Sequence, residues 1–227
     1  MEMNKLHLMD CMEAMREFPD NFFDIAVVDP PYGNAENSAE YNARNGRFGG
    51  RFERYDKDVE RTGGTWAAKY AKKIKSWDTA PPPEYFEELF RISKNQIIWG
   101  GNYFRLPPTR CFLVWHKLTI SETFTMAMAE YAWTSFNENA KLYSFTPQGT
   151  KKNPRFHPTQ KPVELYEWQL RLFAAPGMKV IDTHAGSGSS LIAAHNIGLD
   201  WIGFEIDPDY YQKAEARLNA HMAQIRF

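Results

Sequence analysis

The stretch at residues 22–28 (FFDIAVV) is a short apolar run rich in β-branched residues, and two prolines follow it closely. Such a run is typical of a strand buried inside a parallel sheet. It ends at the prolines because proline lacks the backbone donor that further strand pairing needs. The pattern predicts that the strand stops at Asp29 and that Pro30, Pro31 and Tyr32 stand at its carboxyl end.

The rest of the chain alternates between short apolar runs and segments with helical spacing of apolar residues. Strands are expected at 6–9, 96–99, 111–115, 127–134, 141–145, 178–182 and 201–204, and helices after a capping Asp10 and at 84–92, 163–173, 191–197 and 209–225. This alternation predicts an α/β domain with a mainly parallel, twisted sheet and helices on both faces. The strands between 111 and 145 predict an antiparallel meander, which places a hairpin at one edge of the sheet.

Composition narrows the class of protein. A chain of 227 residues with 43% hydrophobic and 15% aromatic residues is expected to form a single domain, 1–227, with a substantial core. Its net charge of −1 excludes a uniformly basic protein, so affinity for nucleic acid would have to come from locally clustered charge. Cys11 and Cys111 have no CxxC or His-rich context, which argues against disulfides and zinc and favours the cytosol. No apolar run approaches the roughly 18 residues of a membrane span.

Local basic charge occurs in two loops. A polar insertion at about 33–83 leaves the strand end directly, and a shorter loop covers 146–156. In the insertion, cations alternate with aromatic residues, as expected where phosphates and bases are contacted together. A solvated, mobile loop is the alternative interpretation. The candidate DNA-binding residues are Arg44, Arg47, Arg51, Lys72, Lys73, Lys75, Lys151 and Lys152.

The residues after the 22–28 strand suit an aromatic amine. The Asp29 carboxylate and the Pro30 carbonyl can both accept hydrogen bonds from an exocyclic amino group, and the two prolines fix the directions of these acceptors. The Tyr32 ring offers a face on which a flat heterocycle can stack. The alternative is a strand end with a Pro-Pro stop and a surface tyrosine.

A second unit, at 178–205, predicts a nucleoside site. A strand is followed by a turn with Gly186 and Gly188, a helix and another strand, and Glu205 lies 19 positions after Gly186, close to the spacing at which an acid reaches a ribose. The third glycine of the dinucleotide fingerprint is replaced by Leu191, and the turn has no lysine or arginine for a pyrophosphate. An adenosine-containing ligand without phosphates therefore fits better than NAD. An empty glycine turn in a doubly wound fold is the alternative.

The order of these features resembles the β-class DNA amino-methyltransferases, in which an Asp-Pro-Pro-Tyr motif precedes the glycine motif. The resemblance implies a Rossmann-like methyltransferase fold with this circularly permuted motif order, and S-adenosyl-L-methionine as cofactor. It implies a catalytic role for Asp29, Pro30, Pro31 and Tyr32. It implies cofactor binding by Asp10, Cys11, Asp29, Thr159, Lys161, Asp182, His184, Ala185, Gly186, Ser187, Gly188, Glu205 and Ile206.

Some of these roles are specific. By the resemblance, Thr159 and Lys161 contact the cofactor's carboxylate, Asp10 and Cys11 contact its adenine, and Glu205 binds its ribose. Thr183-His184 departs from the Pro-Phe that the family usually carries in the turn. No metal is implied.

The resemblance further implies transfer of a methyl group to N6 of an adenine that is flipped out of double-stranded DNA and stacked on Tyr32. Hydrogen bonds to Asp29 and the Pro30 carbonyl would aim the amine's lone pair at the methyl group. Asp at the first motif position is usual for N6-adenine enzymes, although an N4-cytosine target fits the same chemistry. An RNA or protein-glutamine methyltransferase and a catalytically silent DNA-binding subunit are further alternatives. The family's setting is intracellular, prokaryotic or phage-encoded, and relatives often form homodimers.

Overall fold

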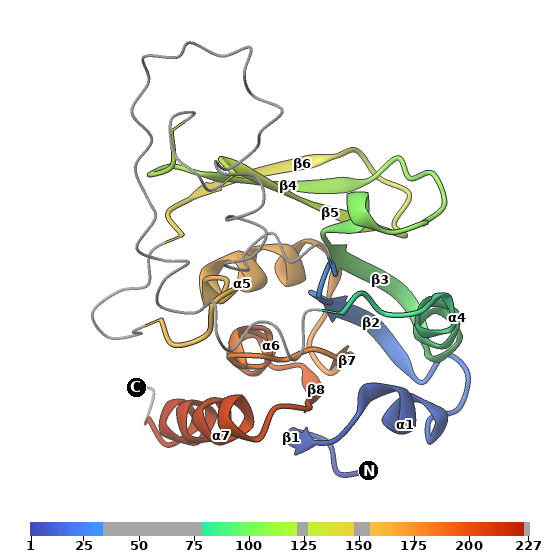
Figure 1. The fold of residues 1–227 in the computed structure, drawn as a ribbon, viewed down its shortest axis with the longest axis vertical. Coiled ribbons are helices and arrows are strands. Elements are labelled where there is room, and N and C mark those ends of the chain that lie inside the picture. The colour runs from blue at the N-terminus through green and yellow to red at the C-terminus, as the bar shows by residue number, and fades with distance from the viewer. Residues whose placement is uncertain (34–78, 122–126, 148–154, 225–227) are drawn as a thin grey trace.

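The computed structural model describes residues 1–33, 79–121, 127–147 and 155–224, and these form one open sheet with helices on both faces (Figure 1). The strands are β1 (Lys5–Leu8), β2 (Phe23–Val28), β3 (Ser93–Trp99), β4 (Phe112–Lys117), β5 (Ala129–Thr134), β6 (Lys141–Phe145), β7 (Lys179–Asp182) and β8 (Asp200–Glu205). The helices are α1 (Cys11–Arg16), α4 (Pro83–Ile92), α5 (Val163–Phe173), α6 (Ser189–Asn196) and α7 (Pro208–Met222), with a 3₁₀ turn η1 at Gly101–Tyr103.

The strand order is β1-β8-β7-β2-β3-β5-β4-β6. Five neighbouring strands, from β1 to β3, pair in parallel, and β5 runs antiparallel to both β3 and β4. The predicted fold class, including the antiparallel hairpin, is confirmed. The predicted meander is wrong in its last strand, because β6 pairs in parallel with β4 and not with β5. Both edges of β5 are already hydrogen bonded to β3 and β4, so only the free edge of β4 can accept β6.

Alternation along the central strand β2 builds the two layers of the core. Ile25 and Val27 are buried in the cluster formed with α5, α6 and α7, whereas Ala26 and Val28 are buried against α1 and α4. This period of two, apolar on both sides, is expected for a strand covered by helices on each face. In Figure 1, the two helix groups lie on opposite sides of the sheet.

Element boundaries differ from the sequence prediction by a few residues. The last helix, α7, begins at Pro208 and ends at Met222, where the sequence predicted 209–225. Asp207 fixes its start, because the carboxylate accepts hydrogen bonds from the backbone N–H groups of Asp209 (2.8 Å) and Tyr210 (3.1 Å). Asp10 caps α1 as predicted, accepting a hydrogen bond from the backbone N–H of Met12 (2.7 Å).

The parallel strands bring distant polar residues to one edge of the sheet. Asp29 follows β2, and Asp182 and Glu205 are the last residues of β7 and β8. Because parallel strands end at the same edge, these three carboxyl groups gather where open α/β sheets bind ligands.

Candidate functional site

A cavity of about 400 Å³ opens at this carboxyl edge. The Asp-Pro-Pro-Tyr segment after β2 and the glycine turn between β7 and α6 both line it, although they lie more than 150 residues apart in the chain. Fourteen of the residues predicted for the site line the cavity: Asp10, Cys11, Asp29, Pro30, Pro31, Tyr32, Thr159, Lys161, His184, Ala185, Gly186, Ser187, Glu205 and Ile206. The structure thus joins the two predicted units at one cavity.

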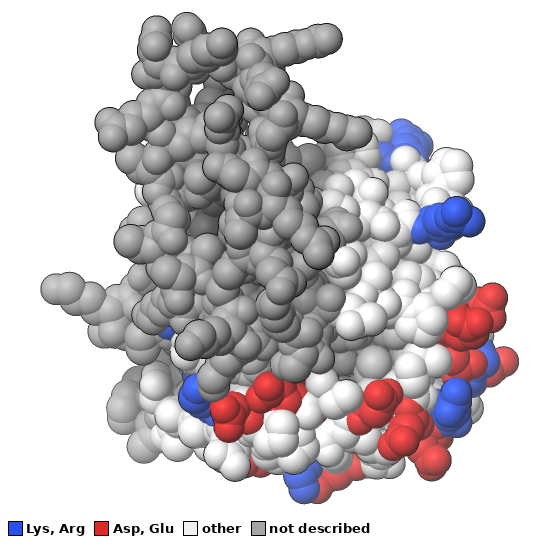
Figure 2. All heavy atoms as spheres, in the orientation of Figure 1, with Lys and Arg blue, Asp and Glu red and all other residues white. Residues whose placement is uncertain are grey.

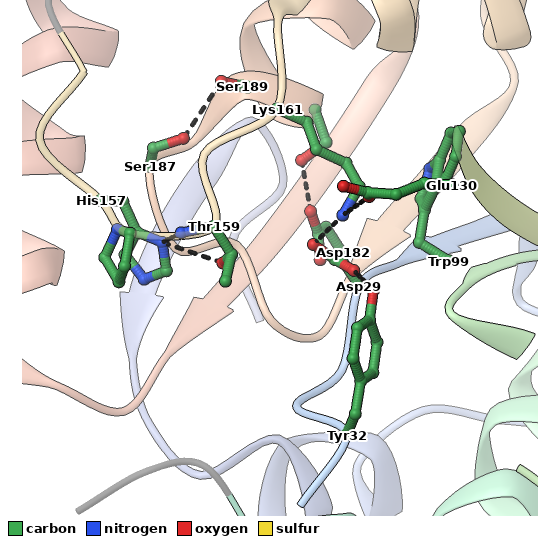
Figure 3. Close-up of polar contacts among 12 residues, drawn as sticks. Asp29, Tyr32, Trp99, Glu130, His157, Thr159, Lys161, Asp182, Ser187 and Ser189 are labelled. Carbon is green, nitrogen blue, oxygen red and sulfur yellow. Dashed lines mark hydrogen bonds and ion pairs between the residues drawn. The ribbon is translucent and has the colours of Figure 1, made fainter. Parts of the chain in front are cut away.

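Asp29 is held by two donors from different segments. The hydroxyl of Tyr32 donates to its Oδ1 (2.9 Å), and the ammonium of Lys161 donates to its Oδ2 (Figure 3). Burial raises the pKa of Asp29 and outweighs the effect of Lys161, which lowers it. The side chain is only 12% exposed, so this carboxyl group faces the cavity from a largely dry site.

The Tyr32 ring stacks on Tyr103 of η1, with centroids 4.5 Å apart and an angle of 18° between the rings. Gly100 makes room for this arrangement. Its backbone is left-handed (φ +67°), and a Cβ atom at this position would overlap the Tyr32 ring. Tyr103 is 42% exposed, so the aromatic stack reaches the surface of the molecule.

Lys161 lies between two carboxylates. Besides Asp29, its ammonium contacts Oε2 of Glu130 on β5 (3.2 Å), and the other oxygen of Glu130 contacts Lys117 at the end of β4 (2.5 Å). Burial opposes ionisation of Glu130, but Lys161 and Lys117 together lower its pKa to about 2. The prediction that Lys161 binds the cofactor's carboxylate stays a prediction, because its described contacts are with Asp29 and Glu130.

The glycine turn is tied to the end of β8. The backbone N–H of Gly186 donates to Oε2 of Glu205 (2.9 Å), and that of Asp207 donates to Oε1 (2.8 Å). Gly186 and Gly188 have positive φ angles of 51° and 71°. A Cβ on Gly186 would press on the ring of His157 at 3.3 Å, so glycine suits both the left-handed backbone of this turn and its packing against His157.

Asp182 and Gly188, two predicted cofactor contacts, are not among the residues that line the cavity. Asp182 instead supports the turn, accepting hydrogen bonds from the backbone N–H of His184 (2.9 Å) and from the hydroxyl of Ser190. Burial raises the pKa of Asp182 to about 7. Gly188 packs against Leu218 of α7. Their assignment to the cofactor stays a prediction.

Thr183 and His184, which depart from the usual Pro-Phe, form a polar cluster with Tyr85 of α4. The Tyr85 hydroxyl lies 2.6 Å from Oγ1 of Thr183, which lies 2.9 Å from Nδ1 of His184. Burial lowers the pKa of His184 to about 4, so the ring is neutral at pH 7. In place of the usual Pro-Phe, this chain therefore has a hydrogen-bonded cluster beside the cavity.

Cys11 lines the cavity as an unreactive thiol, because burial raises its pKa to about 12. Thr159 also lines the cavity, with its Oγ1 3.2 Å from Nδ1 of His157. Cys11 and Thr159 thus both line the cavity, and their contacts with a cofactor stay predictions.

Sequence reasoning missed Glu130, Lys117 and Tyr103. The sequence held one signal each for Glu130 and Lys117. Glu130 is a lone acid in the apolar strand AEYAW, and Lys117 is a lysine at the end of another strand. These signals indicate a place in the site only when the strand order is known, because that order puts the start of β5 at the edge where the parallel strands end.

The predicted DNA-binding residues, Arg44, Arg47, Arg51, Lys72, Lys73, Lys75, Lys151 and Lys152, lie outside the described residues. In the view of Figure 2, acidic side chains form small groups along the lower and right-hand rim, with single basic side chains among them. The part of this face that the structure describes has no broad basic patch.

The described ranges contain neither a metal site nor a membrane-spanning helix. No group of three His, Cys, Asp or Glu side chains there could hold a metal ion. None of the helices within these ranges has the length and apolarity needed to cross a membrane.

The chain is similar in sequence to a putative methylase and in fold to solved DNA methyltransferases. Over 232 residues it is 26% identical to the "Putative methylase YubD" of Escherichia coli (strain K12), a match that covers 93% of this chain and 88% of the relative. Among solved structures, the cytosine-N4-specific PvuII DNA methyltransferase superposes with a TM-score of 0.56 at 14% identity, covering 96% of this chain and 90% of that one.

The M1.HpyAVI complex with S-adenosylmethionine superposes with a TM-score of 0.54 at 19% identity, covering 95% and 98% of the two chains. At such identities, these likenesses establish the shared fold. The family model for DNA methylases matches residues 65–216, which is more than half of the sequence. The chain therefore belongs to the DNA methylase family that this model describes.

Proposed function

We propose that this protein transfers a methyl group from S-adenosyl-L-methionine to the N6 amino group of adenine in double-stranded DNA. The supporting observation is that the Asp29 segment and the glycine turn with Glu205 line the same cavity. If Asp29 binds the amine and Glu205 binds the ribose, one cavity would hold both reactants together, as an in-line transfer requires.

The cavity fits this cofactor. Glu205 is buried at the end of β8 and keeps free lone pairs beyond its two backbone hydrogen bonds, so it can accept from ribose hydroxyls. The turn has no lysine or arginine, and Lys161 is occupied by two carboxylates, which disfavours a pyrophosphate. Asp10 and Cys11, which by resemblance contact the adenine, line the same cavity. When bound, S-adenosylmethionine supplies an electrophilic methyl group on a sulfonium.

The residues of the chain act on the amine. An exocyclic amino group conjugated with its ring is a weak nucleophile, and hydrogen bonds to Asp29 and the Pro30 carbonyl favour a pyramidal nitrogen with a directed lone pair. As the N–C bond forms and the methyl–sulfur bond breaks, the nitrogen would carry an extra proton, and the Asp29 carboxylate would accept it. Because burial raises the pKa of Asp29, this carboxylate is a better acceptor than a solvated aspartate.

Tyr32 provides the surface for the extruded base. Its hydroxyl is committed to Asp29 and one face of its ring to Tyr103, so a flat heterocycle would stack on the other face or take the place of Tyr103. Extrusion from the duplex costs a few kcal/mol, which stacking of about 1–3 kcal/mol per base helps to offset.

N4 of cytosine is the second candidate. The PvuII enzyme, whose fold this chain shares, is specific for that target, and both amines suit the chemistry of Asp29. Adenine is preferred because the motif begins with Asp, which by resemblance is usual for N6-adenine enzymes.

The test is to incubate the purified protein with labelled S-adenosylmethionine and genomic DNA that lacks adenine and cytosine methylation. The DNA is then hydrolysed and its nucleosides separated. Label in N6-methyldeoxyadenosine supports the proposal, and label in N4-methyldeoxycytidine establishes the second candidate. Transfer to RNA or protein, or no transfer to any polymer, would contradict both.

A further inference from the structure

We infer that Glu130, supported by Lys117, is a positioning residue that shares the ammonium of Lys161 with Asp29 and so keeps the Asp29 carboxylate available to the target amine. The inference rests on the proposed function, and it adds two residues, from β5 and β4, to the site. Figure 3 shows Glu130 and Asp29 on either side of the Lys161 ammonium.

The reversed strand places Glu130 there. Because β5 runs antiparallel to β3, its first residues reach the edge where the parallel strands end. Lys117, the last residue of β4, comes to the same edge, and Lys161 arrives from the segment before α5. Three separate elements therefore bring charged groups to the edge of the sheet where Asp29 lies, and Lys161 contacts it directly.

Contacts join the four groups in a continuous series. Lys161 donates to Asp29 and lies 3.2 Å from Oε2 of Glu130, while Oε1 of Glu130 lies 2.5 Å from Lys117. The side chains of Lys161 and Lys117 are 3% and 4% exposed, and that of Glu130 is 28% exposed. Two positive and two negative charges balance in this largely buried group, whereas loss of a single member would leave a charge uncompensated.

The ammonium of Lys161 is also held from a third side. It lies 5.3 Å from the centroid of the Trp99 ring, and the indole N–H of Trp99 donates to Oε1 of the fully buried Gln169 (3.1 Å). With the ring fixed, the ammonium has little freedom to move, and its hydrogen bonds are divided between Asp29 and Glu130. Without Glu130, Asp29 would be its only carboxylate partner among the described residues.

This division affects how well Asp29 accepts a proton. The groups that act on Asp29 are Tyr32, Lys161 and Glu130, and electrostatic coupling extends to Tyr85, Tyr166 and Asp182. Lys161 lowers the pKa of Asp29, and Glu130 raises it. Removal of the Glu130 charge is therefore expected to lower the pKa of Asp29 and weaken it as an acceptor from the amine.

The test compares Glu130→Gln with the wild type in two measurements. Carbon-13 NMR of protein labelled at the aspartate carboxyl groups reports the pKa of Asp29, whose signal is identified by its loss in Asp29→Asn. We expect a lower pKa in Glu130→Gln. We also expect single-turnover methyl transfer to unmethylated DNA to slow by about 10- to 100-fold, with cofactor affinity by calorimetry changed by less than about threefold.

Controls separate positioning from general damage. Lys94→Met removes the exposed ion pair between Lys94 and Asp24, and it should change neither the Asp29 pKa nor the transfer rate. If Glu130→Gln does not fold, the charge-balanced double variant Glu130→Gln/Lys117→Met replaces it, with the same lowered pKa expected. An unchanged pKa of Asp29 together with an unchanged transfer rate would overturn the inference.

The NMR measurement also separates this inference from the proposed function. If the wild type transfers no methyl group to DNA, the proposed function fails, while a lowered Asp29 pKa in Glu130→Gln still supports the role of Glu130. If transfer occurs but neither the pKa nor the rate responds to Glu130→Gln, the inference alone fails.

Discussion

The ammonium of Lys161 donates to the carboxylate of Asp29, although the two residues are 132 positions apart in the chain. This contact ties the segment before α5 to the end of β2, and it is nearly dry, with the two side chains 3% and 12% exposed. A buried pair of this kind is costly to break by removing one partner. The arrangement of the Asp-Pro-Pro-Tyr segment therefore depends on the C-terminal half of the chain.

Gly100→Ala is expected to damage the site beyond its cost in stability. The left-handed backbone costs a non-glycine residue about 1–2 kcal/mol, and the added methyl group would displace the Tyr32 ring. Gly198→Ala is the matched control, because Gly198 has a similar φ of +74° and no atom within 4 Å of an added Cβ. Both variants should lose stability in denaturant unfolding, but only Gly100→Ala should lose methyl transfer. Equal transfer by the two variants would refute the role given to the Tyr32 ring.

Tyr32 should contribute mainly through its ring. Tyr32→Phe removes the hydroxyl that donates to Asp29 but keeps the stacking surface, so transfer should fall by no more than about tenfold. Tyr32→Ala removes both, with a further loss of about 1–3 kcal/mol of stacking. Single-turnover rates on DNA measure the difference, and a Phe variant as impaired as the Ala variant would contradict stacking on this ring.

Glu205→Gln should weaken the cofactor site. The substitution removes the negative charge that would hold the ribose hydroxyls, and hydrogen bonds to charged groups contribute about 1.5–3 kcal/mol, so affinity should fall about 10- to 100-fold. Calorimetry with S-adenosylmethionine measures this, with Lys94→Met as a control that should bind normally. Because the carboxylate also holds the backbone N–H groups of Gly186 and Asp207, thermal unfolding should be followed in parallel. Undiminished affinity would place the ribose elsewhere.

The buried Asp182 predicts a pH dependence of stability. Its pKa is about 7 in the folded protein and near 4 when unfolded, so between these values the folded state binds more protons. This contribution to stability is complete below about pH 4 and is lost as the pH rises toward 7. Asp182→Asn removes it. The free energy of unfolding of the wild type relative to this variant should fall between pH 4 and 7, and a flat difference would contradict the buried acid.

The strands, the motifs that line the cavity and the family could all be predicted from the sequence. The run 22–28 and the turn at Gly186 have local signatures, since a buried strand and a left-handed turn each restrict residue type directly. The parallel pairing of β6 with β4 had no such signature, because it follows from the occupied edges of β5. Glu130 was missed for a related reason, because its position near Lys161 depends on which strands lie beside β5.

Contacts within the site were also beyond the sequence. Lys161 was predicted as a partner of the cofactor's carboxylate, and its described partners are Asp29 and Glu130. A lysine offers the same ammonium to any carboxylate within reach, so only the three-dimensional arrangement selects among them. The loop residues predicted to contact DNA lie outside the described part of the chain, and their role stays a prediction.

The most direct test of the central claim, that one cavity joins methyl donor and amine acceptor, is an isotope-trapping experiment. Labelled S-adenosylmethionine is bound to the wild type or to Asp29→Asn, and unmethylated DNA is then added with an excess of unlabelled cofactor. The wild type should deliver bound label to DNA before it exchanges, whereas Asp29→Asn should bind the cofactor but transfer at least about 100-fold more slowly. Transfer by Asp29→Asn at the wild-type rate would contradict the account.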